Sequence, residues 1–219
     1  MRSRFAEDTI LSALKRGVQQ VVILGAGLDT FAYRARTHGN ELRIFEVDHP
    51  ATQQWKLNQL KRTGIDIPSS VTYVPIDLSK DNLSTALAQN EFRLDQCAIF
   101  SMMGLVIFLE HSFFKATIEF VASISPRSQI VFDYGTSAKL LNATQRKERD
   151  LVVKNSQEQG EPYLTFLDPG ELTTNLSELG FANIEMLDPH EMDKRYLQNR
   201  TDSLSVPRGG RRLVTARTA

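Results

Sequence analysis

A short apolar run that ends in two glycines constrains this chain more than any other feature. Residues 20–24 are Gln, Val, Val, Ile and Leu, and Gly25-Ala26-Gly27 follow directly. Such a run is typical of a buried strand, and glycines at its end allow a sharp turn into a helix. The bare backbone lets a ligand come close, and the helix N-terminus adds free N–H groups and a positive dipole end. The turn therefore predicts a site for a nucleotide-like cofactor; the alternative is that the glycines serve packing alone.

Two further apolar runs end in acids. The run 42–47 is followed by Asp48, near the roughly 20-residue spacing from Gly25 expected of a carboxylate that binds ribose. The run 71–76 is followed by Asp77. Parallel strands end at the same edge of a sheet, so we expect these three positions to lie close together.

The order of apolar runs predicts the fold class. Strands are expected at 20–24, 42–47, 71–76, 96–101, 129–134, 182–187 and 211–216, with helical segments between most of them and one helix over 5–15 before the first. This alternation demands right-handed crossovers and a parallel sheet with helices on both faces. No strong helix pattern precedes the last strand, so it is expected to return antiparallel. We predict an α/β, Rossmann-like, seven-stranded sheet that is mostly parallel, with a C-terminal antiparallel hairpin.

The amino-acid composition limits the kinds of function and partner that this chain can have. The 219 residues, 41% of them hydrophobic and 24% charged, suit a single domain over 1–219. The 26 basic and 26 acidic residues give a net charge of +0, which argues against nucleic acid as a partner. The sequence has no signal-like segment and no apolar stretch of membrane-spanning length, and its single cysteine, Cys97, cannot form an internal disulfide. We expect a cytoplasmic protein without a membrane partner.

One segment departs from the average composition. Residues 135–161 are dense in Lys, Arg, Glu and Gln and carry only a thin apolar stripe. A solvated amphipathic helix is the favoured interpretation. The alternative is a lid over 135–168, because this segment follows the fifth strand at the carboxyl edge of the sheet.

The details of the glycine turn select the cofactor. A dinucleotide site favours G-x-G-x-x-G/A, whereas this turn has Thr30 at the third small position and Asp29 beside the place of a phosphate. Negative charge there is unfavourable for NAD but tolerable for a cofactor with a sulfonium centre and a zwitterionic tail. The turn therefore favours S-adenosylmethionine and disfavours a nicotinamide-dependent oxidoreductase.

These residues resemble the leucine carboxyl methyltransferase-like class I S-adenosylmethionine-dependent methyltransferases, in particular their bacterial branch. The resemblance covers nearly the whole chain. Its segments are Arg2 to Asp8, Val21 to Thr30 with Tyr33 and Arg34, Phe45 to Thr52, Val74 to Leu78, and a weaker trace at Arg195 and Tyr196.

The resemblance implies roles for particular residues. Arg2 matches the arginine that binds the carboxylate of the cofactor's methionine, and the Gly25-Ala26-Gly27 turn matches the cofactor loop. Asp48 matches the acid on the ribose hydroxyls, and Asp77 with Leu78 matches the pair that brackets the adenine. These roles agree with the chemistry of the side chains, because a guanidinium binds a carboxylate and carboxylates accept hydrogen bonds from hydroxyls.

Two positions in the cofactor region depart from the family pattern. Met103 stands where the family has a glutamate, and a methionine cannot accept hydrogen bonds from the cofactor's ammonium group as a carboxylate would. Phe108 replaces a tyrosine and keeps the ring without the hydroxyl. The family also carries several tens of residues before the arginine motif, so we expect either a trimmed form or a more open active site.

The resemblance implies an O-methyltransferase that acts on a carboxylate of a small molecule or peptide. An ionised carboxylate needs desolvation and alignment but no general base, which suits a chain with no evident catalytic dyad. We assign no catalytic residue and no metal site, and the sequence leaves the oligomeric state and the acceptor's identity open. The alternative, suggested by Met103, is a protein that binds S-adenosylmethionine with reduced or no methyl transfer.

Overall fold

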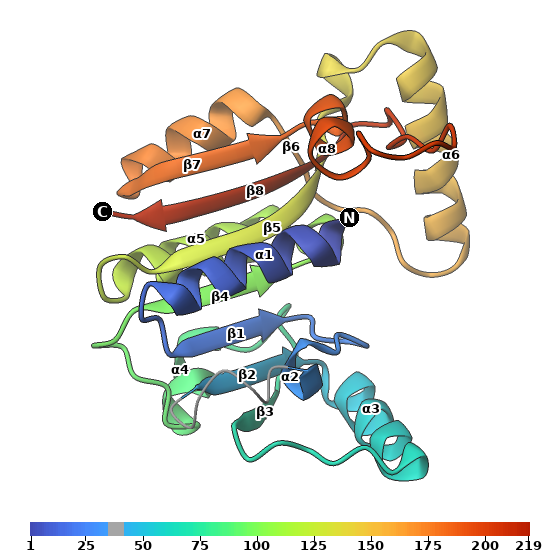
Figure 1. Cartoon of the computed structure of the whole chain (residues 1–219). Helices are drawn as coiled ribbons and strands as arrows, with labels where there is room; N and C mark the ends of the chain where they lie inside the picture. The colour runs from blue at the N-terminus through green and yellow to red at the C-terminus, as the bar shows by residue number, and fades with distance from the viewer. Residues whose placement is uncertain (35–41) are drawn as a thin grey trace.

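The computed structural model describes residues 1–34 and 42–219, and a mixed eight-stranded sheet forms its centre (Figure 1). The strand order is β3-β2-β1-β4-β5-β8-β7, and β6 pairs with the end of β5. The strands are β1 (Gln20–Leu24), β2 (Arg43–Asp48), β3 (Val71–Pro75), β4 (Ala98–Met102), β5 (Gln129–Thr136), β6 (Phe166–Leu167), β7 (Phe181–Leu187) and β8 (Arg211–Thr218). Only the pairings of β8, with β5 and with β7, are antiparallel among the strands described.

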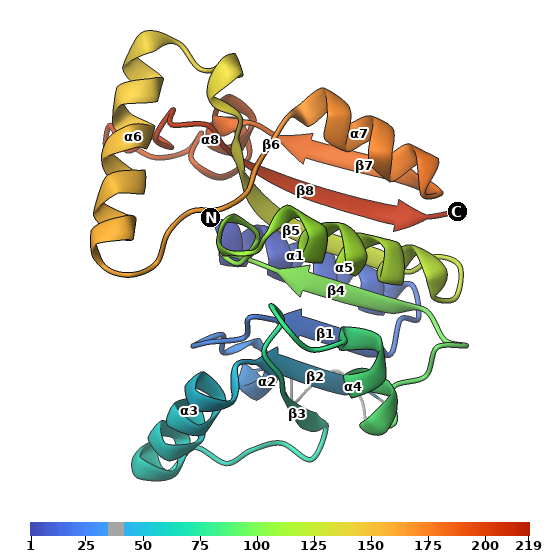
Figure 2. The same cartoon turned by 180° about the vertical axis from the view of Figure 1, so that it is seen from behind.

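Helices cover both faces of the sheet. They are α1 (Arg2–Lys15), α2 (Phe31–Arg34), α3 (Pro50–Thr63), α4 (Leu83–Gln89), α5 (His111–Ser123), α6 (Ala143–Glu158), α7 (Pro169–Glu178) and α8 (Pro189–Tyr196), with short 3-10 turns η2 (Val106–Phe108) and η3 (Ala138–Leu140). Figure 2 shows α4, α5 and α7 on one face, and Figure 1 shows α1 across the other. Every residue of β1 and β4 is buried, because parallel strands in this arrangement are covered on both sides.

The register brings the ends of neighbouring strands to one edge. Leu24 pairs with Val47, and Asp48 pairs with Pro75. On the other side of β1, Ile23 pairs with Ser101 near the end of β4. The segments that follow β1, β2, β3 and β4 therefore meet at the carboxyl edge, where ligands of open α/β sheets bind.

The predicted fold class is confirmed, with two local corrections. All seven predicted strands are present, and their ends are shifted by at most two residues. The additional strand β6 was missed because two residues carry no periodic pattern. The connection before the last strand, expected to lack a strong helix, contains α8, which Asp188 caps through a capping box with Glu191.

The charged segment after β5 forms α6, in which no residue is buried. Asn142 and Gln145 form a capping box at its start, so local hydrogen bonds support this helix where packing does not. Leu151 and Val152 are 61% and 50% exposed. This agrees with the predicted solvated helix; the lid stays a prediction. None of the helices within residues 1–34 and 42–219 combines the length and the hydrophobicity that a membrane span requires.

Candidate cofactor site

The turn after β1 is held by backbone hydrogen bonds to the end of β2. The N–H groups of Gly25 and Ala26 donate to the carbonyl oxygen of Val47 at 2.9 and 3.2 Å. Gly25 and Gly27 have φ angles of +63° and +41°, a region that side chains disfavour. A Cβ on Gly25 would lie 3.1 Å from Cδ1 of Leu105, which packs on the turn from the segment after β4. The glycines are therefore required by backbone conformation and, at Gly25, by close packing.

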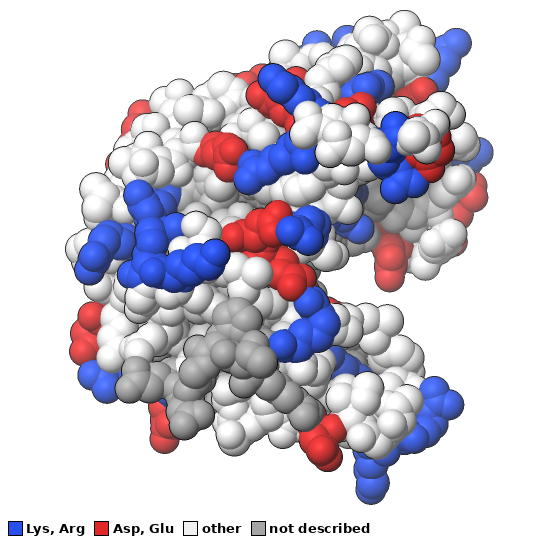
Figure 3. Space-filling view, viewed as in Figure 1, with Lys and Arg blue, Asp and Glu red and all other residues white. Residues whose placement is uncertain are grey.

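A cavity of about 290 Å³ opens beside this turn. It brings together Arg2, the Gly25-Ala26-Gly27 turn and Met103, all of which the sequence predicted for the cofactor. The remaining lining residues are Ser3, Ile23, Leu24, Leu28, Asp29 and Ser101. Figure 3 shows the molecular surface deeply hollowed at this edge of the sheet, between the part that carries α6 and the part that carries α3. The cavity thus lies where the fold places a ligand.

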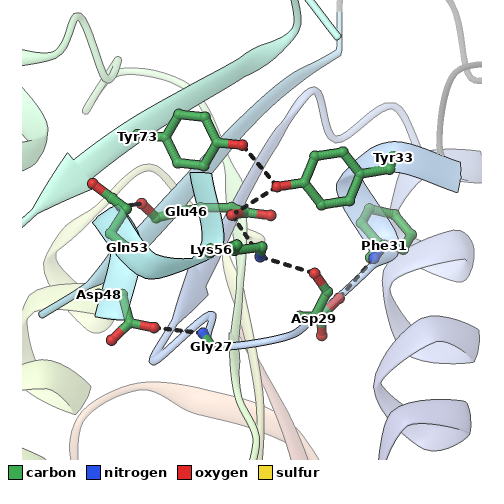
Figure 4. Close-up of polar contacts among 9 residues, drawn as sticks. All are labelled: Gly27, Asp29, Phe31, Tyr33, Glu46, Asp48, Gln53, Lys56 and Tyr73. Carbon is green, nitrogen blue, oxygen red and sulfur yellow. Dashed lines mark hydrogen bonds and ion pairs between the residues drawn. The ribbon is translucent and has the colours of Figure 1, made fainter. Parts of the chain in front are cut away.

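Asp48 lies at the end of β2, directly against the glycine turn (Figure 4). Its Oδ2 accepts a hydrogen bond from the N–H of Gly27, and its Oδ1 accepts one from the N–H of His49 at 2.7 Å. The carboxylate is half-buried, and each of its oxygens has a further lone pair. Asp48 does not itself line the cavity, but it is anchored by the backbone of the turn that does, and its oxygens retain acceptor capacity for ligand hydroxyls.

Asp29 serves the helix that follows the turn. Its Oδ1 accepts a hydrogen bond from the N–H of Phe31 at 2.7 Å, at the start of α2. Its backbone oxygen accepts one from Nζ of Lys56 at 2.9 Å. The negative charge of Asp29, which disfavours a bound phosphate, thus interacts with the N-terminus of α2.

A buried polar cluster lies behind the turn (Figure 4). Nζ of Lys56, from α3, forms an ion pair with Oε2 of Glu46 at 2.8 Å, and both residues are less than 5% exposed. The hydroxyl of Tyr33 lies 3.4 Å from Oε2 of Glu46 and 2.7 Å from the hydroxyl of Tyr73. Burial raises the pKa of Glu46, although Lys56 opposes the shift, and burial also raises the pKa of both tyrosines. The cluster links α3, β2, α2 and β3 directly beneath the turn.

Asp77 and Leu78 follow β3 at the same edge but do not line the cavity. The carboxylate of Asp77 accepts hydrogen bonds from Lys80 and from Ser79, which lower its pKa. Leu78 lines a separate hollow of about 270 Å³ next to α4 and α5. Their role at the adenine stays a prediction.

Several residues of the site were missed by reasoning from the sequence. Ser3, Leu28 and Ser101 line the cavity, but small or isolated side chains give no chemical signal in a sequence. Asp133 is different, because an acid inside the apolar run of β5 is a signal for a buried, partnered charge. Its carboxylate accepts a hydrogen bond from Nη1 of Arg2 at 3.3 Å.

No group of three or more His, Cys, Asp or Glu residues is placed to hold a metal ion within residues 1–34 and 42–219. A larger hollow of about 380 Å³ lies between α5 and α7 on the face of the sheet, and none of the predicted site residues lines it. The cavity at the glycine turn is therefore the candidate site.

The fold and this site together define the class of the protein. Five strands in the order β3-β2-β1-β4-β5 pair in parallel, and β8 lies antiparallel between β5 and β7. At the carboxyl edge, a glycine turn borders a cavity, and the carboxylate at the end of the next strand binds the backbone of that turn. This is the arrangement of class I S-adenosylmethionine-dependent methyltransferases. Solved methyltransferase structures share the fold over most of this chain.

Two of those structures illustrate the likeness. A structure described as a "putative methyltransferase" from Thermobifida fusca YX aligns with a TM-score of 0.67 at 13% identity, covering 97% of this chain and 79% of that one. The magnesium protoporphyrin IX methyltransferase ChlM from Synechocystis PCC 6803 aligns with a TM-score of 0.54 at 13% identity, covering 99% and 83%. At this identity the likeness concerns the fold alone.

Sequence comparison identifies the family. The profile of the leucine carboxyl methyltransferase family matches residues 1–122. The "Putative S-adenosyl-L-methionine-dependent methyltransferase YktD" of Bacillus subtilis (strain 168) is 33% identical over 206 residues, which are 94% of this chain and 67% of that protein. A protein of the same description from Mycolicibacterium paratuberculosis (strain ATCC BAA-968 / K-10) is 33% identical over 134 residues, 61% of this chain and 49% of its own length.

This chain belongs to the leucine carboxyl methyltransferase family of S-adenosylmethionine-dependent methyltransferases. It spans about two thirds of the length of the Bacillus relative and about half of the mycobacterial one. The resemblance inferred from the glycine turn and the segments around Asp48 is therefore confirmed.

Proposed function

We propose that this protein transfers a methyl group from S-adenosylmethionine to a carboxylate oxygen of a small molecule or peptide. Membership of the family supports the reaction class. The acceptor must meet the methyl group where the hollow adjoins the cofactor cavity, and the observation that carries the choice of acceptor is that the described lining of this cavity includes no histidine, lysine, glutamate or tyrosine. Its one acid, Asp29, caps α2. A carboxylate acceptor is already ionised at neutral pH and needs no base, whereas an alcohol must lose a proton.

The residues around the cavity fit the proposed methyl donor. Arg2 is the one cationic side chain in the described lining, and it is half-exposed, so its N–H groups can reach a ligand carboxylate. Asp48 offers acceptors for ribose hydroxyls, and the glycines leave room for close approach. When bound, S-adenosylmethionine would supply a methyl group on a positively charged sulfur: a carboxylate oxygen would bond to the methyl carbon as the carbon–sulfur bond breaks, and S-adenosylhomocysteine would be the leaving group. The protein's contribution is to align the two partners and to exclude water.

The acceptor is proposed to bind in the hollow between α6 and α3. This hollow adjoins the cavity at the carboxyl edge of the sheet (Figure 3). Since α6 buries none of its own residues and presents Leu151 and Val152 to solvent, it has apolar side chains available to cover an acceptor. We include α6 in the proposal as the lid of the acceptor site.

A labelled-methyl assay tests the proposed function. The protein is incubated with S-adenosylmethionine carrying a radioactive methyl group and with a panel of organic acids and peptides, each paired with its amide. Transfer to the acids alone is expected, and the product should release volatile methanol in base, as methyl esters do. Label that is stable in base, or that appears equally on the amides, would contradict a carboxylate acceptor. Binding without transfer to any acid would support the alternative of a binding protein.

A further inference from the structure

Asp133 is a buried carboxylate that joins three elements. It lies in β5 and is 1% exposed. Its Oδ2 accepts hydrogen bonds from Nη1 of Arg2, at the start of α1, and from Nη1 of Arg211, at the start of β8. Its Oδ1 accepts the backbone N–H of Gly104, in the segment after β4. A buried charge is costly unless it is paired and hydrogen-bonded, so these contacts restrict where each partner can lie.

Two of the three partners border the cofactor cavity. Arg2 lines the cavity itself, and Gly104 follows Met103, which also lines it. Gly104 has a φ angle of +75°, and a Cβ there would lie 3.1 Å from Nη1 of Arg2. The guanidinium of Arg2 therefore packs against the backbone of Gly104, and the same carboxylate binds both.

The geometry leaves Arg2 partly available to a ligand. Its side chain is 50% exposed, and its ion pair with Asp133 uses Nη1. Guanidinium carries five N–H donors, so the others can bind a second carboxylate. A free arginine side chain loses conformational entropy when it binds a ligand, and the contact with the buried carboxylate of Asp133 restricts the side chain before the ligand arrives.

The charges at this point do not cancel. Two guanidinium groups, of Arg2 and Arg211, share the single carboxylate of Asp133. The excess positive charge favours an anionic group at the open side of Arg2. S-adenosylmethionine carries one such group, the carboxylate of its amino-acid end.

We infer that Asp133 is a positioning residue: it orients Arg2, and with it the segment at Gly104, to receive the carboxylate at the amino-acid end of the cofactor. This inference rests on the proposed function, because it requires that the cavity binds S-adenosylmethionine. Asp133 touches no ligand itself and acts through Arg2. Its loss should therefore weaken the recognition of the amino-acid end and leave the recognition of the adenosine unchanged.

Two ligands separate these effects. Asp133→Asn is titrated with S-adenosylhomocysteine and with methylthioadenosine, which keeps the adenosine and the thioether but lacks the amino-acid end. Affinity for S-adenosylhomocysteine should fall at least tenfold, and affinity for methylthioadenosine should change less than twofold. An equal loss for both ligands in the variant would overturn the inference and leave the proposed function intact. If the unsubstituted protein binds neither ligand, the proposed function fails and the inference fails with it.

A second variant tests the same contact with the buried carboxylate still present. Gly104→Ala places a Cβ against Nη1 of Arg2, and its control is Gly17→Ala, where φ is +91° and nothing lies within 4 Å of the added Cβ. Gly104→Ala should show the selective loss for S-adenosylhomocysteine, and Gly17→Ala should not. The same loss in both variants would overturn the inference.

A double variant shows whether Asp133 acts through Arg2. In an Arg2→Ala background, the further change Asp133→Asn should leave the ratio of the two affinities unchanged, because the side chain that Asp133 positions is already absent. A further tenfold fall in the ratio would show that Asp133 acts by another route and would overturn the inference.

Discussion

Asp48 shows at the scale of one residue how a side chain can be both structural and available to a ligand. Its carboxylate accepts the N–H groups of Gly27 and His49, which fix its orientation at the end of β2. The sequence predicted the position of this acid from its spacing to Gly25. The structure shows that Asp48 contacts the glycine turn directly, so the two parts of the predicted site, the turn and the acid, are joined by a hydrogen bond.

Asp48→Ala should lower the affinity for S-adenosylhomocysteine at least about tenfold, because hydrogen bonds to a charged group contribute roughly 1.5–3 kcal/mol. Isothermal titration calorimetry measures the effect. The matched control is Asp95→Ala, which removes an exposed acid, paired with Arg93, from the segment before β4 at the opposite edge of the sheet. The control should bind like the unsubstituted protein. Unchanged affinity in Asp48→Ala would refute the ribose role.

The glycine turn yields a second prediction at this scale. Gly25→Ala should lower folding stability by about 1–2 kcal/mol, because the φ angle at this position is positive. It should also lower cofactor affinity by about tenfold or more, because the added Cβ displaces Leu105 beside the cavity. Gly64→Ala is the control, with a φ of +67° at the end of α3 and open space around the added Cβ. Thermal unfolding and calorimetry together should show similar destabilisation but a loss of binding only in Gly25→Ala. Equal binding by the two variants would contradict a functional role for the turn.

At the scale of elements, α3 supports the cofactor turn through one buried lysine. Lys56 pairs with Glu46 of β2 and donates to the backbone oxygen of Asp29, in the turn that leads into α2. Cation–π contact adds to this, because Nζ lies 5.3 Å from the centre of the Tyr33 ring. A helix that contributes few apolar residues to the core is thereby tied to two other elements.

Lys56→Met should lower the free energy of unfolding by about 3–5 kcal/mol, because it leaves the carboxylate of Glu46 buried without its cation. Urea denaturation measures this change. The combined variant Lys56→Met with Glu46→Leu should recover part of the loss, since no buried charge then remains unpaired. Lys154→Met on α6 is the control: it breaks an exposed ion pair of 3.8 Å with Glu158 and should cost less than about 1 kcal/mol. A similar small cost in both single variants would contradict a structural role for the buried pair.

Elements differ in how well the sequence predicts them. The strands β1, β2 and β5 were predicted within two residues, because continuous apolar runs bounded by polar residues carry a strong local signal. The strand β6 carries none: Phe166 and Leu167 pair with Gly135 and Thr136 only because the chain returns to the end of β5. Its existence depends on a contact between distant segments and not on its own two residues.

One buried and two half-buried tyrosines give a prediction about how the stability of the folded protein depends on pH. Burial raises the pKa of Tyr33, Tyr73 and Tyr134 in the folded state, whereas in the unfolded chain each should titrate near 10. Above that pH the unfolded state loses protons that the folded state retains. The stabilising contribution is therefore complete below about pH 10 and declines as the pH rises further.

Urea unfolding between about pH 9 and about pH 11 should show this decline in the free energy of unfolding. Tyr33→Phe removes one of the groups, so its curve should fall less steeply over the same range, whatever its stability at neutral pH. Parallel curves for the variant and the unsubstituted protein would show that Tyr33 ionises as readily in the fold as in the unfolded chain.

Seven strands of the sheet, the glycine turn with Asp48 on the next strand, and hence the family could be predicted from the amino-acid sequence, because each depends on residues that are close together along the chain. Which distant side chains meet is seen in the folded structure alone. Asp133 lies 131 positions from Arg2 and 78 from Arg211, and their shared ion pairs follow from α1 crossing the sheet and β8 inserting beside β5. The pattern of apolar residues along the chain indicates whether a segment is a helix or a strand and which of its faces is buried. It does not indicate which other elements pack against that segment, because this depends on the packing of the whole chain.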